Sequence, residues 1–181
     1  QATAPQVIHL FVTTCSTRKT ALPLARNVRQ ACASIYSHNQ ENIMKEIKPG
    51  LEHTFRYVVP KSKMVPALYP EAQDFQVMPE VFATGFMVGL LEWACLDAIK
   101  PYLDWPAEMS LGTHINVSHS AATPEGLEVT VKVRLTAVEG KKLSFEVEAH
   151  DGIDLISKGT HERFVVSKEK FVKRLKEKRI K

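Results

Sequence analysis

The sequence predicts an α+β domain in which one antiparallel sheet wraps around a single long central helix. Three observations support this prediction: an almost wholly apolar segment at residues 81–99, one alternating segment before it, and four alternating segments after it. A helix that is apolar on every side must be covered on several sides, and a curled sheet can do that. The 181 residues suffice for one domain with a core, whereas two full domains would be cramped.

The first predicted strand covers residues 53–59. Phe55, Tyr57 and Val59 share one face, and Pro60 ends the run. Three prolines between residues 61 and 79 argue against a regular element there. The aromatic residues in the same stretch indicate an apolar loop that is able to cover a pocket.

The apolar segment predicts a buried helix, which Pro101 ends. Its length approaches that of a membrane span. However, Glu92 near its middle would be costly in lipid, and no other stretch supports insertion. We therefore expect a core helix and no membrane association.

Strict alternation of apolar and polar residues predicts three strands after the helix, and a further strand at residues 111–119 precedes them. The pattern is clearest in residues 127–135, where Leu and Val alternate with Glu, Thr, Lys and Arg. Turns at Glu139-Gly140 and Asp151-Gly152 predict hairpins. The four expected strands are residues 111–119, 127–135, 143–149 and 155–166.

The net charge of +4 is unevenly distributed. Residues 1–40 carry four basic and no acidic residues, residues 168–181 predict a basic C-terminal helix, and the remainder has an acidic excess. Nucleic-acid binding needs a basic surface on the folded unit, so we expect no nucleic-acid partner. The basic helix is expected to be a solvated surface, with a role in steering coenzyme A phosphates as the alternative.

Three divisions of the chain are expected: an N-terminal extension (1–43), a folded domain (44–167) and the basic helix (168–181). The extension has the composition of a transit peptide, but Met44 also begins a stretch typical of a natural protein start. We expect a cytoplasmic protein, or one of an organellar matrix if the extension is a transit peptide. Three widely spaced cysteines favour neither disulfides nor a zinc site.

Glu92 and Thr84 are the candidate reactive residues of the helix. An acid placed among Val88 and Leu96 on one helix face is either functional or a structural carboxylate held by a polar partner. Thr84 precedes Gly85 at the start of the helix, where hydroxyls commonly cap. Alternatively, its hydroxyl lies beside a reactive carbonyl, and N–H groups near Gly85 receive the oxyanion.

His119 is the candidate general base. Alternation along the predicted strand 111–119 places it on the inward face with Ile115 and Val117, although a lone inward histidine is more often an ordinary core residue. His114 is five residues away and falls on the opposite face, which argues against shared metal ligation. Phosphate-loop, dinucleotide-binding and HExxH motifs do not occur in the sequence. We expect no metal.

Three segments resemble the fluoroacetyl-CoA thioesterase family: PEVFATGFMVGLLEWAC, SLGTHINVSHSAATPEGLEVTV and AHDGIDLISKGTHER. The similarity spans about Met44 to Phe171. It implies a hotdog fold, hydrolysis of a short-chain acyl-CoA such as fluoroacetyl-CoA or acetyl-CoA, and a homodimer with active sites near the subunit interface. It implies no cofactor, because coenzyme A is part of the substrate.

The resemblance also implies roles for individual residues. Thr84, Glu92 and His119 match the catalytic set. Gly112 matches a glycine that lines the acyl pocket, and Arg163 matches an arginine near the fluorine-binding region, although a surface charge is its ordinary interpretation. The matched covering segment keeps Phe75 but has Met78 where characterised members carry a phenylalanine gate. Because methionine is flexible, we expect less sharp discrimination between acyl groups.

Two other functions stay open on the same scaffold: a non-catalytic acyl-CoA-binding or regulatory module, and an enoyl-CoA hydratase. The attacking group also stays open, since Thr84, Glu92 and water are all suitable nucleophiles.

Overall fold

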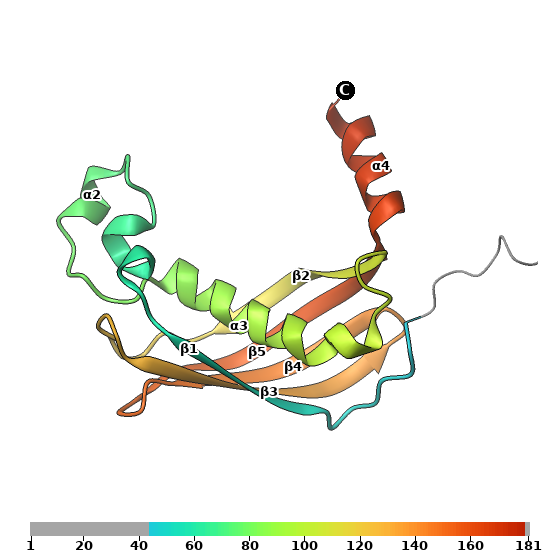
Figure 1. Ribbon diagram of the computed structural model, residues 1–181, viewed down its shortest axis with the longest axis horizontal. Helices are drawn as coiled ribbons and strands as arrows, with labels where there is room; N and C mark the ends of the chain where they lie inside the picture. The colour runs from blue at the N-terminus through green and yellow to red at the C-terminus, as the bar shows by residue number, and fades with distance from the viewer. Residues whose placement is uncertain (1–43, 180–181) are drawn as a thin grey trace, which may run out of the picture. The chain divides into compact units, whose positions relative to one another are not determined.

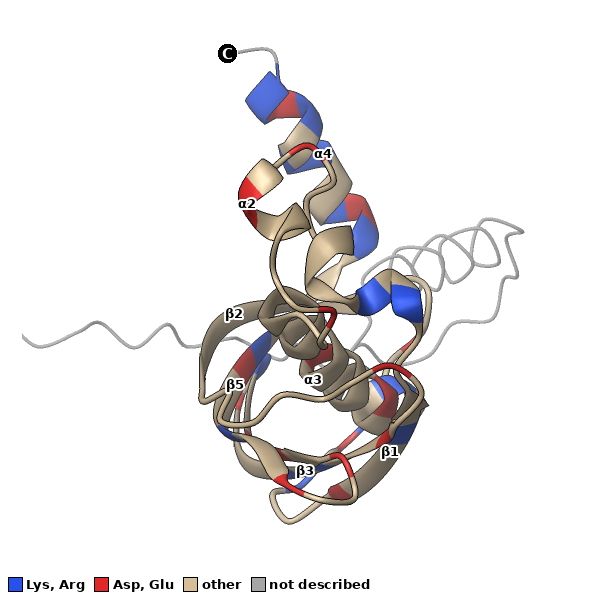
Figure 2. Ribbon diagram, turned by 90° about the vertical axis from the view of Figure 1, so that its left-hand side faces the viewer, with Lys and Arg blue, Asp and Glu red and all other residues tan. Residues whose placement is uncertain are grey.

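The computed structural model describes residues 44–179. Five antiparallel strands form one sheet in the order β1-β3-β4-β5-β2. The sheet curls around one long helix, α3, which lies in its concave face (Figures 1 and 2). The strands are β1 (Glu52–Val58), β2 (Glu108–Val117), β3 (Glu128–Glu139), β4 (Lys142–His150) and β5 (Leu155–Ser167). The predicted α+β arrangement is confirmed, whereas the predicted extension at residues 1–43 lies outside the described residues.

The core lies between α3 (Thr84–Ile99) and the inner face of the sheet. Alternation produces this face: Val129, Val131 and Val133 on β3 are at most 3% exposed, while the residues between them are polar. The helix presents a buried stripe of Met87, Leu90, Leu91, Ala94, Cys95, Ala98 and Ile99. Each fully buried aliphatic side chain contributes about 1.5–3 kcal/mol.

Helix α3 begins three residues later than the sequence predicts, at Thr84. Residues 81–82 bond to other segments instead: the Val81 carbonyl accepts from the Val65 N–H, and the Phe82 N–H donates to the Thr123 carbonyl. The helix ends at Ile99, as expected, and a 3₁₀ turn (Lys100–Tyr102) that contains Pro101 follows. Opposite the buried stripe, Trp93 is 49% exposed, so the sheet of one chain does not cover the apolar helix on every side.

Strand β2 differs from its prediction at both ends, since it covers residues 108–117 rather than 111–119. His119 therefore follows the strand instead of continuing its alternation. A register shift between Gly112 and His114 also interrupts that alternation. The two hairpin turns are where the sequence places them, with Gly140 at φ 61° and Gly152 at φ 90°, backbone conformations that favour glycine.

The segment between β1 and α3 contains only short turns of helix: η1 (Lys61–Lys63), η2 (Val65–Ala67) and α2 (Gln73–Gln76). We call residues 61–79 the lid segment. It lies at the end of the domain where α3 begins (Figure 1). Tyr69 and Phe75 stack within it, with ring centroids 5.9 Å apart. The expected apolar covering loop is therefore present, with short helical turns that the prolines did not prevent.

The predicted basic C-terminal helix is confirmed as α4 (Lys168–Arg179), which extends from the end of β5 and contains no buried residue. Lys and Arg occupy much of its length, with acidic residues between them (Figure 2). Across residues 44–179, helices long and apolar enough to cross a membrane do not occur.

Candidate active site

Thr84 and His119 meet at the start of α3. The Thr84 Oγ1 atom lies 2.8 Å from His119 Nδ1, which is hydrogen-bonding distance. Ala83, not Thr84, occupies the N-cap position, and it makes no side-chain capping bond. The hydroxyl of Thr84 is thus directed at the imidazole rather than at the helix backbone, and its capping interpretation is wrong.

Hydrogen bonds to β5 hold His119 in place after β2 has ended. Ser118 donates its N–H to the Lys158 carbonyl, and Ser120 donates its N–H to the Ile156 carbonyl and its hydroxyl to the Leu155 carbonyl. The residues on both sides of His119 are therefore anchored. This anchoring gives a loop residue the fixed position that the sequence analysis expected from a strand.

The environment of His119 keeps its imidazole neutral. Burial lowers the pKa of His119 from its usual 6.5, and the nearby Ala121 backbone only partly opposes this. Nε2 is buried and has no hydrogen-bond partner among residues 44–179. When Nε2 carries the ring proton, Nδ1 accepts a hydrogen bond from the Thr84 hydroxyl. The pair has the geometry of a hydroxyl beside a general base.

The first turn of α3 adds unpaired backbone donors next to this pair. N–H groups at the start of a helix have no intrahelical acceptor and carry the positive end of the helix dipole. Gly85 provides one of them. Leu68 of the lid segment packs so closely that a Cβ on Gly85 would lie 3.0 Å from Leu68 Cδ1. A cavity of about 260 Å³ lies on the adjacent face of α3, where Gly85, Phe86 and Trp93 line it but Thr84 and His119 do not.

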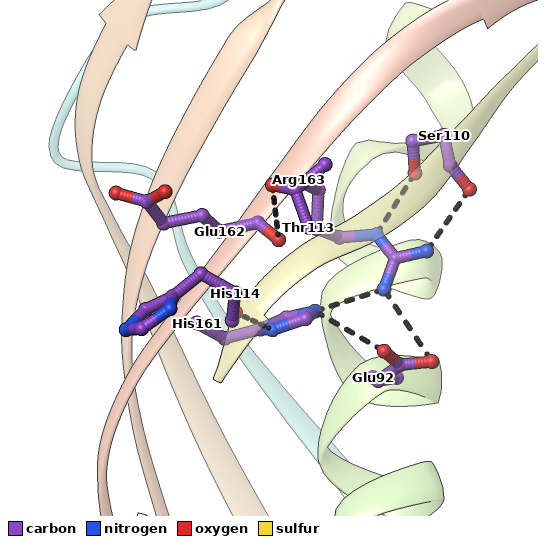
Figure 3. A network of polar contacts seen from close by, with 7 residues as sticks. All are labelled: Glu92, Ser110, Thr113, His114, His161, Glu162 and Arg163. Atoms are coloured by element: carbon purple, nitrogen blue, oxygen red, sulfur yellow. Dashed lines mark hydrogen bonds and ion pairs between the residues drawn. The ribbon is translucent and has the colours of Figure 1, made fainter. Parts of the chain in front are cut away.

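Glu92 lies in a second cluster, two turns further along α3 (Figure 3). Its carboxylate is 4.0 Å from Arg163 Nη1 and 3.9 Å from His161 Nε2, and its side chain is 39% exposed. Arg163 also donates from Nε to Ser110 Oγ and from Nη2 to the Ser110 carbonyl. With 2% of its surface exposed, Arg163 is not the surface charge that was its alternative interpretation.

Gly112 of β2 leaves the space that the Glu92 carboxylate occupies. A Cβ on Gly112 would overlap Glu92 Oε1 and lie 3.1 Å from His161 Cε1. The predicted pocket glycine therefore contacts the predicted catalytic acid. Only a residue without a side chain allows this carboxylate to approach the β2 backbone.

His161 is a buried member of this cluster that the sequence analysis missed. It lies on β5 with its side chain on the inner face, as do Arg163 and Val165. Residues 161, 163 and 165 alternate with more exposed positions, and this alternation was the signal that could have located His161. However, two of these inward positions hold polar residues, and a search for alternating apolar residues does not detect them.

The predicted catalytic residues thus form two groups within one chain. Thr84 contacts His119, while Glu92 contacts the Gly112–His161–Arg163 region. Eight residues separate Thr84 from Glu92, which corresponds to about 12 Å along a helix axis. Of the predicted gate residues, Phe75 stacks on Tyr69, and Met78 is 47% exposed in the lid segment. Groups of three or more metal-ligating side chains do not occur within residues 44–179.

Comparison with known proteins identifies the family. The family model described as fluoroacetyl-CoA-specific thioesterase matches residues 67–169. The chain belongs to this family. As a family member it is a thioester hydrolase, which favours hydrolysis over hydration or simple binding. The fluoroacetyl-CoA thioesterase of Streptantibioticus cattleyicolor is 55% identical over 132 residues, which cover 73% of this chain and 94% of the relative.

Solved structures extend the family comparison to the fold. A fluoroacetyl-CoA thioesterase variant in complex with fluoroacetate is 55% identical, with a TM-score of 0.71 over 73% of this chain and 98% of that one. A thioesterase superfamily member from Thermus thermophilus is 30% identical, with a TM-score of 0.64 over 75% of this chain and 97% of that one. A hot-dog-like protein from Thermanaerovibrio acidaminovorans has a TM-score of 0.62 at 22% identity, over 73% and 93% of the two chains. The predicted hotdog fold is confirmed.

Proposed function

We propose that the protein hydrolyses short-chain acyl-CoA thioesters, such as fluoroacetyl-CoA and acetyl-CoA, to the free acid and coenzyme A. The observation that carries the proposal is the 2.8 Å contact between Thr84 and His119 at the start of α3. Relatives support the substrate class, since solved structures of fluoroacetyl-CoA thioesterases contain fluoroacetate, acetyl-CoA and CoA.

In the proposed reaction, neutral His119 removes a proton as the thioester carbonyl is attacked. The proton comes from Thr84 or from a water molecule held beside it. N–H groups in the first turn of α3, including that of Gly85, receive the oxyanion, and one such donor contributes about 3 kcal/mol to transition-state stabilisation. The protonated imidazole then returns its proton as the thiolate of coenzyme A leaves. Where Thr84 is the nucleophile, a water molecule that gives its proton to His119 then attacks the acyl-Thr84 ester, which releases the free acid and restores the hydroxyl.

Glu92 supplies a carboxylate that either activates water or attacks the carbonyl itself. Its surroundings support such a role, because the Arg163 guanidinium faces the carboxylate at 4.0 Å while 39% of the side chain remains accessible. Gly112 and Arg163 are the proposed substrate-binding residues on this side. Phe75 and Met78 are the proposed covering residues on the other.

We further propose that the protein acts as a homodimer. The face of α3 that carries Thr84, Val88 and Glu92 is open to solvent or half-buried, and β2 pairs with a neighbour on one side only. Uncovered strand edges favour association. A second copy over this face would enclose the acyl group between the two clusters. Sedimentation equilibrium is expected to give twice the chain mass of 20.3 kDa.

The proposed setting is the cytoplasm, or an organellar matrix if residues 1–43 act as a transit peptide. The absence of acidic residues before Glu41 supports the second alternative.

A thiol-release assay with a panel of acyl-CoA esters tests the proposed activity. We expect release of coenzyme A from fluoroacetyl-CoA and acetyl-CoA. Crotonyl-CoA, followed by absorbance, is expected not to be hydrated. Equilibrium binding of acyl-CoA without thiol release, or hydration alone, would contradict the proposal.

The same panel tests the lid segment. Met78→Phe is expected to raise the kcat/KM ratio of fluoroacetyl-CoA to acetyl-CoA several-fold, because a stiff ring replaces a flexible side chain. Val77→Phe is the matched control, since Val77 is 86% exposed, and this variant should leave the ratio unchanged. An equal response of both variants would remove Met78 from the gate.

A further inference from the structure

His161 is a buried imidazole to which the proposed reaction assigns no step. It is 1% exposed and lies between β2, β5 and α3. Both of its ring nitrogens are used: Nδ1 lies 2.8 Å from the His114 carbonyl oxygen, and Nε2 lies 3.0 Å from Arg163 Nη1. Such complete pairing fixes the orientation of the ring.

The two partners also determine the protonation state of the ring. A carbonyl oxygen only accepts, so Nδ1 must carry the proton, and a guanidinium only donates, so Nε2 must accept. Burial is the largest cause that lowers the pKa of His161, and the charge of Arg163 lowers it further, while the hydrogen bond to His114 and the charges of Glu92 and Glu162 oppose the change. His161 is therefore a neutral acceptor.

Nε2 of His161 orients Nη1 of Arg163, which is the guanidinium nitrogen that faces Glu92. Ser110 fixes the Nε and Nη2 side of the guanidinium, whereas Nη1 donates to His161 and lies 4.0 Å from Glu92 Oε2. Without His161, Nη1 would lose the acceptor that holds it in this orientation. Because the plane of a guanidinium is rigid, small rotations displace the charge that faces the carboxylate.

We propose that His161 is a positioning residue for Glu92. Its neutral imidazole holds Nη1 of Arg163 toward the carboxylate, while the gap at Gly112 admits the carboxylate from the other side. This inference rests on the proposed function, in which Glu92 takes part in thioester hydrolysis.

Two variants of His161 separate its two hydrogen bonds. In His161→Gln, the amide oxygen reaches the position of Nε2 and accepts from Arg163. In His161→Asn, the shorter amide reaches only the His114 carbonyl. We expect His161→Gln to keep kcat within about 3-fold of the parent, and His161→Asn to lower kcat about 10-fold or more with little change in KM. Equal kcat values for the two variants, at equal melting temperatures, would overturn the proposal.

A double-mutant cycle measures whether His161 affects kcat through Glu92 or only through the stability of the fold. If His161 acts through Glu92, then His161→Asn should have no further effect on kcat in a Glu92→Gln background. Full additivity of the two effects would overturn the proposal. Full turnover by Glu92→Gln alone would instead remove Glu92 from the proposed function.

Nuclear magnetic resonance of the parent protein labelled with ¹⁵N-histidine measures the tautomer and the titration of His161 directly. This test needs no variant. We expect one histidine to carry its proton on Nδ1 and to titrate below the usual histidine pKa of 6.5. A proton on Nε2, or titration of this residue at or above pH 6.5, would overturn the inference.

Discussion

The Thr84–His119 pair and the Glu92 cluster lie on the same helix but differ in what holds them. Thr84 meets a neutral imidazole from a loop anchored by serines, and neither group carries a charge. Glu92 faces a buried guanidinium on β5, which two further hydrogen-bonded residues fix. The first arrangement suits transfer of a proton, and the second suits orientation of a charge.

The two regions should therefore respond to different perturbations. The pair depends on one hydrogen bond and on the protonation state of His119, so pH and removal of the imidazole should affect it most. The cluster depends on close packing around the carboxylate, so an added methyl group should be enough to disturb it.

The largest effect is expected from removing a reactive group in either region. His119→Ala and Glu92→Gln should each lower kcat/KM by at least about 100-fold, the lower end for a catalytic base or acid, with the fold intact. Thiol release measures the loss. His150→Ala and Glu125→Gln are matched controls, because both residues are exposed and outside the two regions. Normal turnover by either active-site variant would remove that region from the reaction.

A smaller effect, confined to the cluster, is expected from Gly112→Ala. The new methyl group would overlap Glu92 Oε1, the far end of a flexible side chain, so the carboxylate should move rather than the strand. We expect kcat to fall about 10-fold, while the melting temperature changes little. Parallel measurement of turnover and thermal unfolding checks this. A large loss of stability with normal activity would show that turnover does not depend on where the Glu92 carboxylate lies.

The smallest effect concerns pH and distinguishes the pair from the cluster. The folded protein keeps His119 neutral below its usual pKa of 6.5, so the acid limb of kcat/KM should have its midpoint below pH 6.5. A profile measured from pH 5 to pH 8 tests this. An acid limb centred above pH 6.5 would mean that His119 is not the titrating base.

The lowered pKa values of His119 and His161 also predict how the stability of the fold depends on pH. The pKa values of His119 and His161 are both lowered on folding, so the unfolded chain takes up protons first as the pH falls through 6.5. Their contribution to stability is complete above that value and is lost as the pH falls toward the folded-state pKa values. Urea unfolding at pH 7.5 and 5.5 should therefore show a lower free energy of unfolding at the acid value.

Sequence patterns predicted some site residues better than others. Thr84 and Glu92 were found because polar residues stand out in an apolar helix, and Gly112 and Arg163 were found through the family resemblance. His161 was not found, because a polar residue at an inward strand position looks like an ordinary surface residue until its partners are known. The predicted end of β2 at His119 was wrong, because hydrogen bonds from Ser118 and Ser120 to β5 replace the strand there.

By itself, the sequence determined the five strands, the central helix and the basic C-terminal helix, their order, and the inner faces of β1, β3 and β4, since apolar periodicity reflects local geometry and burial. It also determined the family, because long matching segments preserve both helix and sheet. Only the tertiary structure decided which reactive groups meet: Thr84 with His119 across 35 residues, and Glu92 with Arg163 and His161 across about 70. Such contacts depend on strand register and on the rotation of α3 over the sheet, which periodicity does not encode.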